Sequence, residues 1–248
     1  MNKNIKLVIA YDGTDFCGWQ RQENTRTVQG EIEKALLKMH GHPVSLAGAG
    51  RTDSGVHASG QAASFYSDID MEARRFAPAL NSLLSRDVRI TQADEAHSDF
   101  HARFSAKARV YRYQFLCRPC LPHESRYHLQ LRRYPRTGIL NAYGRLISGE
   151  TDCSIFAGAG DRAVTENRSK NRFIYRSYFY IEKDVLVFEI CANAFLRNMV
   201  RSIAGTFLHY EESGTPPEKL REIIASGERS LAGPTLPPHG LFLWNVVY

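Results

Sequence analysis

An acidic side chain and an arginine stand two residues apart in a glycine-rich stretch of the chain. The stretch reads Gly48-Ala49-Gly50-Arg51-Thr52-Asp53-Ser54-Gly55-Val56-His57-Ala58. An arginine beside an aspartate keeps the carboxylate ionised, and an ionised carboxylate can serve as a nucleophile or a general base. Residues two apart in an extended segment share a face, so Arg51 and Asp53 can act together. The alternative is a structural ion pair that fixes a hairpin, since such pairs are common.

The flanks of this stretch predict how it is positioned. Residues 44–46 before it and 62–66 after it are apolar and alternating, which indicates a strand, a tight loop and a second strand. Gly50 and Gly55 give the backbone angles that other residues avoid, so the loop can aim its side chains into a cleft.

The remaining elements of the first part follow from hydrophobic periodicity. We expect strands at 5–11 and 88–93, a helix at 27–40 with Thr27 as its N-cap, and a second helix at 70–85 with Leu83 facing inward. Trp19, in the loop after the first strand, is interpreted as sealing the core rather than as a platform for stacking a base. The order of elements is β-α-β-β-α-β.

The second part repeats this pattern with one helix added. Alternation predicts a strand at 108–117, with Tyr111, Tyr113 and Phe115 on one face, and a hairpin formed by 173–182 and 185–192. Helices are expected at 139–147, at 193–210 with Arg197 and Arg201 on one side, and from 216 to Gly227; a last strand covers 241–248. These patterns predict an α+β fold of two similar halves with antiparallel sheets.

Positive charge is concentrated in the second part. The formal net charge is +6, and the stretch 106–136 holds eight basic residues against one acid, Glu124. The basic residues are Lys107, Arg109, Arg112, Arg118, Arg126, Arg132, Arg133 and Arg136. Arginines interleaved with aromatic rings suit RNA binding, although a charge run can also be a solvated face. The polar, mostly basic loop 161–172 is a further candidate for RNA contact or disorder.

Composition limits the other possibilities. The 248 residues suffice for one large or two small domains, and no apolar run approaches the ~20 residues of a membrane span. Five scattered cysteines and a start without a signal-peptide pattern predict free thiols in the cytoplasm. Cys117 and Cys120 have the spacing of half a zinc site, but a second pair is missing from the sequence, so no metal is expected.

Four stretches together resemble the TruA family of tRNA pseudouridine synthases. The first is the Gly-Arg-Thr-Asp stretch ending at Ala58, and the second is Asp12-Gly13 followed by Phe16-Cys17-Gly18-Trp19-Gln20. The third is residues 104–113, and the fourth is residues 193–201. The resemblance continues to the C-terminal Gly240-Leu241-Phe242-Leu243.

The resemblance implies a function and a set of site residues. Asp53 corresponds to the catalytic aspartate, Tyr111 and Arg201 to active-site residues that bind substrate, and Arg51 is a further candidate for substrate binding. The reaction implied is isomerisation of uridine to pseudouridine at positions 38, 39 and 40 in the anticodon stem-loop of tRNA. It needs no cofactor, because every product atom except the exchanged C5 proton is already in the substrate.

The resemblance also implies an architecture. We expect two ferredoxin-like domains around a central RNA-binding cleft: residues 1–100 with the catalytic loop, and residues 101–248 completing the active site. A homodimer would hold one tRNA.

Three other functions remain open at this point. The chain could be a pseudouridine synthase of the same fold with another RNA target, or a catalytically silent RNA-binding protein. An unrelated aspartate-dependent hydrolase would need a second carboxylate or a metal cluster, and the sequence offers no convincing one.

Overall fold

The first strand shows how an alternating sequence builds the first sheet. In the computed structural model, which describes residues 2–248, β1 (Lys3–Tyr11) fully buries Ile5, Leu7 and Ile9. β1 pairs antiparallel with β3 (His57–Ser67) on one side and with β4 (Val88–Ala96) on the other. Because alternate side chains point to opposite faces of a strand, one face of this sheet becomes continuously apolar.

The chain forms two compact units. One contains the described residues up to Arg109 together with Phe242–Tyr248, and the other contains Val110–Leu241. In the first unit the strand order is β4-β1-β3-β10. The last of these, β10 (Leu241–Val247), runs parallel to the start of β3, and the short β2 (Ala47–Gly48) pairs antiparallel further along β3.

Helix α1 (Val28–His40) covers the apolar face of the first unit. The Thr27 side chain accepts a hydrogen bond from the Gly30 N–H, as predicted for its N-cap, and Gly41 ends the helix with a φ of 75°. Ile32 and Leu36 are fully buried. This confirms the helix that the periodicity predicts.

The second predicted helix of this unit is wrong in its extent. The structure has a single 3₁₀ turn, η1 (Ala73–Arg75), followed by the short α2 (Phe76–Asn81). The Asn81 side chain forms two hydrogen bonds of 2.8 Å with the backbone of Ile90, which diverts the chain toward β4. Leu83, expected to face inward, is therefore 40% exposed.

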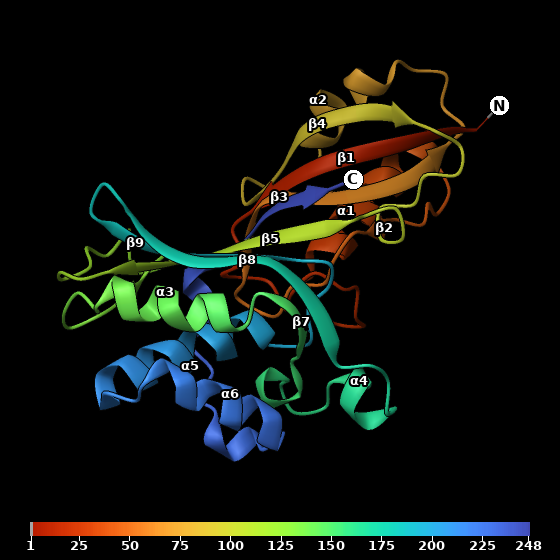
Figure 1. Ribbon diagram of the computed structural model, residues 1–248. Helices are drawn as coiled ribbons and strands as arrows, with labels where there is room; N and C mark the ends of the chain where they lie inside the picture. The colour runs from red at the N-terminus through yellow and green to blue at the C-terminus, as the bar shows by residue number, and fades with distance from the viewer. Residues whose placement is uncertain (1) are drawn as a thin grey trace. The chain divides into compact units, whose positions relative to one another are not determined.

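The second unit is a sheet of order β5-β9-β8-β7 with helices beside it (Figure 1). The predicted hairpin is confirmed, since β8 pairs with β9 up to Glu182 and Val185 on either side of a two-residue turn. The strands are β5 (Ala108–Leu116), β6 (Leu129–Gln130), β7 (Gly149–Asp152), β8 (Asn171–Glu182) and β9 (Val185–Ala192). The α-helices are α3 (Thr137–Leu146), α4 (Arg162–Thr165), α5 (Met199–Ser213) and α6 (Pro217–Ser226). The 3₁₀ turns are η2 (Ser154–Phe156), η3 (Arg229–Leu231) and η4 (Pro238–Gly240).

An aromatic cluster joins sheet and helices in the second unit. Phe179 of β8 stacks on Phe188 of β9 with ring centroids 4.6 Å apart, and Phe188 contacts Phe207 of α5 at 6.1 Å. Tyr143 of α3 lies 5.4 Å from the same Phe207 ring. Aromatic pairs at such distances add to the stabilisation from burial, so this cluster fixes α3 and α5 on the sheet.

The helix predicted to open at residue 193 begins at Met199. Asn198 takes a left-handed φ of 60°, and the Asp161 carboxylate accepts a hydrogen bond from the backbone N–H of Arg197. Both features hold residues 193–198 outside the helix. Arg197 and Arg201 therefore do not share one helical face, contrary to the prediction.

The fold is a mixture of helices and mostly antiparallel strands, which agrees with the predicted α+β class. The basic loop expected at 161–172 instead contains α4 and the first residues of β8. Among residues 2–248, no helix combines the length and apolar character needed to cross a membrane.

A buried carboxylate in α5 yields a test of stability. Glu211 is 2% exposed and accepts hydrogen bonds of 2.7 Å from Arg133 and from Arg136. Burial raises the pKa of this carboxyl, but the arginine hydrogen bonds outweigh burial and bring the pKa to about 2. We expect Glu211→Gln to lower the free energy of unfolding at neutral pH by about 2 kcal/mol in urea titrations.

The same substitution changes the response to acid. A carboxyl whose pKa falls from 4.5 to about 2 on folding gives stability that is complete above 4.5 and is lost as the pH falls toward 2. Glu211→Gln should therefore flatten this part of the stability profile. Glu212→Gln, which alters the exposed neighbour, is the matched control. Equal profiles for the two variants would contradict the role given to Glu211.

Candidate functional site

The loop carrying Arg51 and Asp53 connects β2 to β3 in the first unit. Its start is held to β3 by a hydrogen bond of 2.8 Å from the Ala49 N–H to the Ala62 carbonyl oxygen. The Gln61 side chain donates to the Gly50 carbonyl oxygen at 2.9 Å. The predicted arrangement of strand, loop and strand is therefore present, although its first strand is Ala47–Gly48 rather than residues 44–46.

Thr52 anchors the middle of this loop. It is 7% exposed, its hydroxyl lies 2.8 Å from the Tyr11 hydroxyl, and its carbonyl oxygen accepts a hydrogen bond from the Trp19 N–H at 3.1 Å. Arg51 is exposed and Asp53 is half-buried. Because the residue between them points into the fold, the two charged residues flank a fixed point of the backbone.

The loop after β1 supports the same segment. Gly18 has a φ of +84°, and a Cβ atom there would lie 2.6 Å from the Thr52 carbonyl oxygen and 3.2 Å from the Asp53 carbonyl carbon. The Ser54 hydroxyl donates to the Phe16 carbonyl oxygen at 3.1 Å. Only a glycine permits this approach, so the two loops position one another.

Trp19 closes the core of the first unit. Its side chain is 2% exposed, and a Cβ on Gly48 would lie 2.4 Å from its indole nitrogen. The core-sealing interpretation is therefore confirmed, and a base-stacking role is excluded by burial.

His57 is a structural residue at the end of the loop. It is 1% exposed, its Nδ1 accepts the Gly13 N–H at 3.0 Å, and the same nitrogen lies 3.2 Å from the Asp12 carboxylate. Its ring stacks on Phe242 with centroids 4.7 Å apart. The histidine thus joins the turn after β1, the start of β3 and the start of β10.

Arg109 is a residue whose position the sequence analysis missed. Its guanidinium donates to the Ala49 and Arg103 carbonyl oxygens, both at 2.8 Å. The sequence places it only within a basic run, with no signal that it reaches the loop carrying Arg51 and Asp53. The structure makes it a support of the segment that leads to Arg51 and Asp53.

Tyr111 and Arg201 lie in the second unit. Tyr111 on β5 is 7% exposed and meets the Phe195 ring edge-on, with centroids 4.9 Å apart. Arg201, in the first turn of α5, donates to the Leu236 carbonyl oxygen at 2.6 Å and to the Asn198 side-chain oxygen at 3.0 Å. The sequence gives no signal for the contact of Phe195 with Tyr111 or for that of Asn198 with Arg201.

Tyr113 ties the same region to β5. Its hydroxyl donates to the Pro237 carbonyl oxygen at 2.6 Å, next to the carbonyl that Arg201 binds. Burial raises the pKa of this hydroxyl well above its usual range, and the positive charge of Arg201 offsets part of the effect. The neutral hydroxyl is therefore a hydrogen-bond donor that fixes the loop beside Arg201.

The four predicted site residues thus fall into two pairs. Arg51 and Asp53 share the loop of the first unit, and Tyr111 and Arg201 belong to the second. Each of the four takes part in further interactions within the fold.

The basic run 106–136 is compensated by acids from elsewhere in the chain. The ion pairs are Arg112–Glu189, Arg118–Glu124, Arg118–Asp184, Arg133–Glu211 and Arg136–Glu211. Hydrogen bonds from Arg118 lower the pKa of Glu124 to about 2. The imbalance of eight to one in the sequence window is therefore reduced in the fold, because three of the compensating acids lie beyond residue 180.

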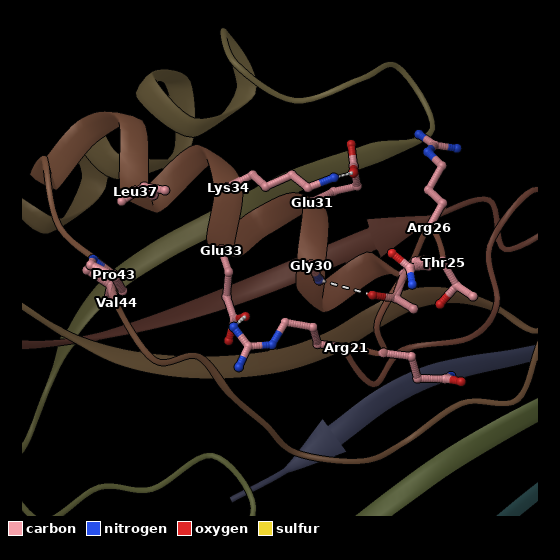
Figure 2. A pocket seen from close by; sticks show the side chains of 13 residues that line it. Arg21, Thr25, Arg26, Gly30, Glu31, Glu33, Lys34, Leu37, Pro43 and Val44 are labelled. Atoms are coloured by element: carbon pink, nitrogen blue, oxygen red, sulfur yellow. Dashed lines mark hydrogen bonds and ion pairs between the residues drawn. The ribbon is translucent and has the colours of Figure 1, made fainter.

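A cavity of about 670 Å³ lies beside α1 in the first unit (Figure 2). Its cations are engaged with acids in the pairs Arg21–Glu33, Lys34–Glu31 and Arg26–Asp87. Since these charges compensate one another, the cavity offers no strong site for an anion. Among residues 2–248, no three His, Cys, Asp or Glu side chains gather as a metal site.

Comparison with known proteins assigns the family. The model of the tRNA pseudouridine synthase family matches residues 7–105 and 145–248. The chain is 51% identical to tRNA pseudouridine synthase A of Treponema denticola, over 99% of this chain and 93% of that protein. The synthase of the same name from Treponema pallidum is 46% identical over 96% of this chain and 85% of that protein. That of Caldicellulosiruptor saccharolyticus is 41% identical over 99% and 100%. The chain belongs to the tRNA pseudouridine synthase family.

Proposed function

We propose that this protein is an isomerase that converts uridines of tRNA to pseudouridines, with Asp53 as its catalytic residue. One observation carries the proposal: Asp53 follows a buried threonine that two separate segments hold in place, in a chain of this family. The proposed targets are positions 38, 39 and 40 of the anticodon stem-loop.

The chemistry conserves the atoms of the nucleoside. The bond from N1 to C1′ breaks, the uracil turns, and C5 bonds to C1′; the proton on C5 is exchanged with solvent and N1 gains a proton. The Asp53 carboxylate can add to C6, attack C1′ or take a proton from the ribose, because an ionised carboxylate is both a nucleophile and a base. No electrons are transferred, so the reaction needs no cofactor.

The other three residues receive supporting roles. Tyr111 would pack against the displaced base, and Arg201 would bind the phosphate or carboxylate nearby. A uridine within a stem must leave the stack, at a cost of a few kcal/mol. The exposed Arg51 is suited to fill the space that the base vacates.

We further propose the architecture that the resemblance implies. In this proposal two ferredoxin-like domains, residues 1–100 and 101–248, line an RNA-binding cleft, and a homodimer holds one tRNA in the cytoplasm. The element order β1-α1-β2-β3-α2-β4 in the first unit supports one copy of the proposed repeat. The second unit has the order β5-β6-α3-β7-α4-β8-β9-α5-α6, so it contains β5-α3-β8-β9-α5 together with four further elements.

Two alternatives make different predictions for the RNA. A synthase with another target would leave tRNA positions 38 to 40 unmodified but act on other uridines. A silent binding protein would bind tRNA and modify none. Mapping pseudouridines in a tRNA pool treated with the protein separates all three.

We expect Asp53→Asn to abolish tritium release from tRNA labelled at uridine C5, by more than about 10³-fold, with tRNA binding retained. The amide keeps the shape of the side chain but lacks its charge and basicity. Asp15→Asn removes the same charge from an exposed position in the neighbouring loop and should leave the rate unchanged. Equal release by wild type and Asp53→Asn would remove Asp53 from the mechanism.

Gly18→Ala tests whether the neighbouring loop positions Asp53. Both Gly18 and Gly41 have positive φ, but a Cβ at Gly41 meets no atom within 4 Å, whereas one at Gly18 meets the backbone of Thr52 and Asp53. Each alanine should cost about 1 kcal/mol of stability through backbone strain. Only Gly18→Ala should also lower kcat, about tenfold or more, when both folded variants are assayed at the same temperature. Unchanged kcat in Gly18→Ala would show that Asp53 is positioned without this contact.

A further inference from the structure

A cavity of about 760 Å³ in the second unit has a lining unlike that of the cavity beside α1. Among the described residues that line it, two have cationic side chains, Lys170 and Arg229, and none has an acidic side chain. Small residues supply much of the rest, among them Gly158, Ala159 and Gly160. We call it the Lys170 cavity. Walls of small residues let a ligand approach the backbone closely, and the unbalanced positive charge favours an anion.

Several hydrogen-bonding groups of the Lys170 cavity are unused by the fold. Among the described residues, the Lys170 ammonium has no hydrogen-bond or ion-pair partner, and neither do the backbone N–H groups of Ala159 and Gly160. The Ser154 hydroxyl oxygen is buried and likewise lacks a partner in the described part of the chain. A water or a bound ligand would satisfy a buried hydroxyl of this kind.

Arg229 is held in place by hydrogen bonds to other residues that line the Lys170 cavity. It donates to the Gly233 carbonyl oxygen at 3.1 Å and to the Thr235 hydroxyl at 3.0 Å. These bonds use two of the five N–H donors of a guanidinium and fix its position, so its remaining donors are preorganised. A fixed arginine, a lysine without a partner and adjacent backbone N–H groups suit a phosphate group.

The Lys170 cavity adjoins one of the proposed substrate-binding residues. Asn198 lines the cavity, and its side-chain oxygen accepts the hydrogen bond from Arg201 at 3.0 Å. Thr235 also lines it, and the next residue, Leu236, provides the carbonyl oxygen that Arg201 binds. An anion in the cavity would therefore lie near Asn198, the side chain that Arg201 binds.

We propose that the Lys170 cavity binds a nucleotide phosphate group, with Lys170 and Arg229 as its cationic ligands. The source is either a phosphodiester of the tRNA next to the target uridine or a free nucleotide. This inference rests on the proposed function, because the position beside Arg201 makes the tRNA backbone the expected source.

Lys170→Ala is the variant of choice, because the Lys170 side chain has no partner in the described fold and its loss should leave thermal unfolding unchanged. Arg229→Ala would also release the loop at Gly233 and Thr235. Binding of unmodified tRNA is measured over a range of salt concentrations, and binding of uridine 5′-monophosphate by calorimetry. Lys219→Ala, which removes an equal charge from an exposed ion pair with Glu222, is the control.

We expect Lys170→Ala to weaken tRNA binding about tenfold and to reduce the slope of log K against log salt by about 0.7 to 0.9, the value for one phosphate contact. Lys170→Arg should restore both quantities, and Lys219→Ala should change neither. A loss confined to the uridine 5′-monophosphate measurement would support the phosphate site and assign it to a free nucleotide. Unchanged binding in both measurements would overturn the proposal.

Failure of this inference is distinguishable from failure of the proposed function. If wild-type protein forms no pseudouridine in tRNA, the proposed function fails regardless of the Lys170 variants. If wild type forms pseudouridine while Lys170→Ala binds both ligands as well as wild type does, the phosphate site alone is wrong.

Discussion

The burial of Thr52 is the constraint on which the loop carrying Arg51 and Asp53 depends. Its hydroxyl lies against Tyr11 at the end of β1, and its carbonyl oxygen binds the Trp19 N–H. A loop residue fixed at both its side chain and its backbone also restrains the backbone of its neighbours, Arg51 and Asp53. The carboxylate of Asp53, the proposed catalytic group, is therefore positioned by an uncharged neighbour, as preorganisation requires.

In the second unit, Arg201 is held by backbone carbonyl groups. Arg201 and Tyr113 donate to the consecutive carbonyl oxygens of Leu236 and Pro237. A peptide carbonyl is neutral, so these bonds orient the guanidinium without cancelling its charge. This differs from the pairing of Arg133 with Glu211, where a full negative charge meets the cation. The carbonyl bonds orient a guanidinium, whereas the bonds to Glu211 also place a negative charge beside it.

Local patterns predicted the regular elements well but not the places where side chains interrupt them. The alternation of β1 and the capped helix α1 follow from sequence alone, because each depends on residues close in the chain. The early end of α2 and the late start of α5 depend on Asn81 binding Ile90 and on Asp161 binding Arg197. Such distant hydrogen bonds leave no periodic signal. The candidate site residues could be identified from a sequence motif. The contacts of Arg109 and Asn198 could be found only in the folded structure.

The ion pairs of the basic run do not remove its positive charge. Glu211 is one carboxylate bound by two guanidinium groups, so the cluster of Arg133, Arg136 and Glu211 keeps a formal charge of +1. The side chains of Arg133 and Arg136 are 53% and 59% exposed, so this charge reaches solvent. A buried acid shared by two exposed arginines stabilises the fold and still presents positive potential. Structural pairing and electrostatic recognition of a phosphate backbone are thus compatible within one cluster.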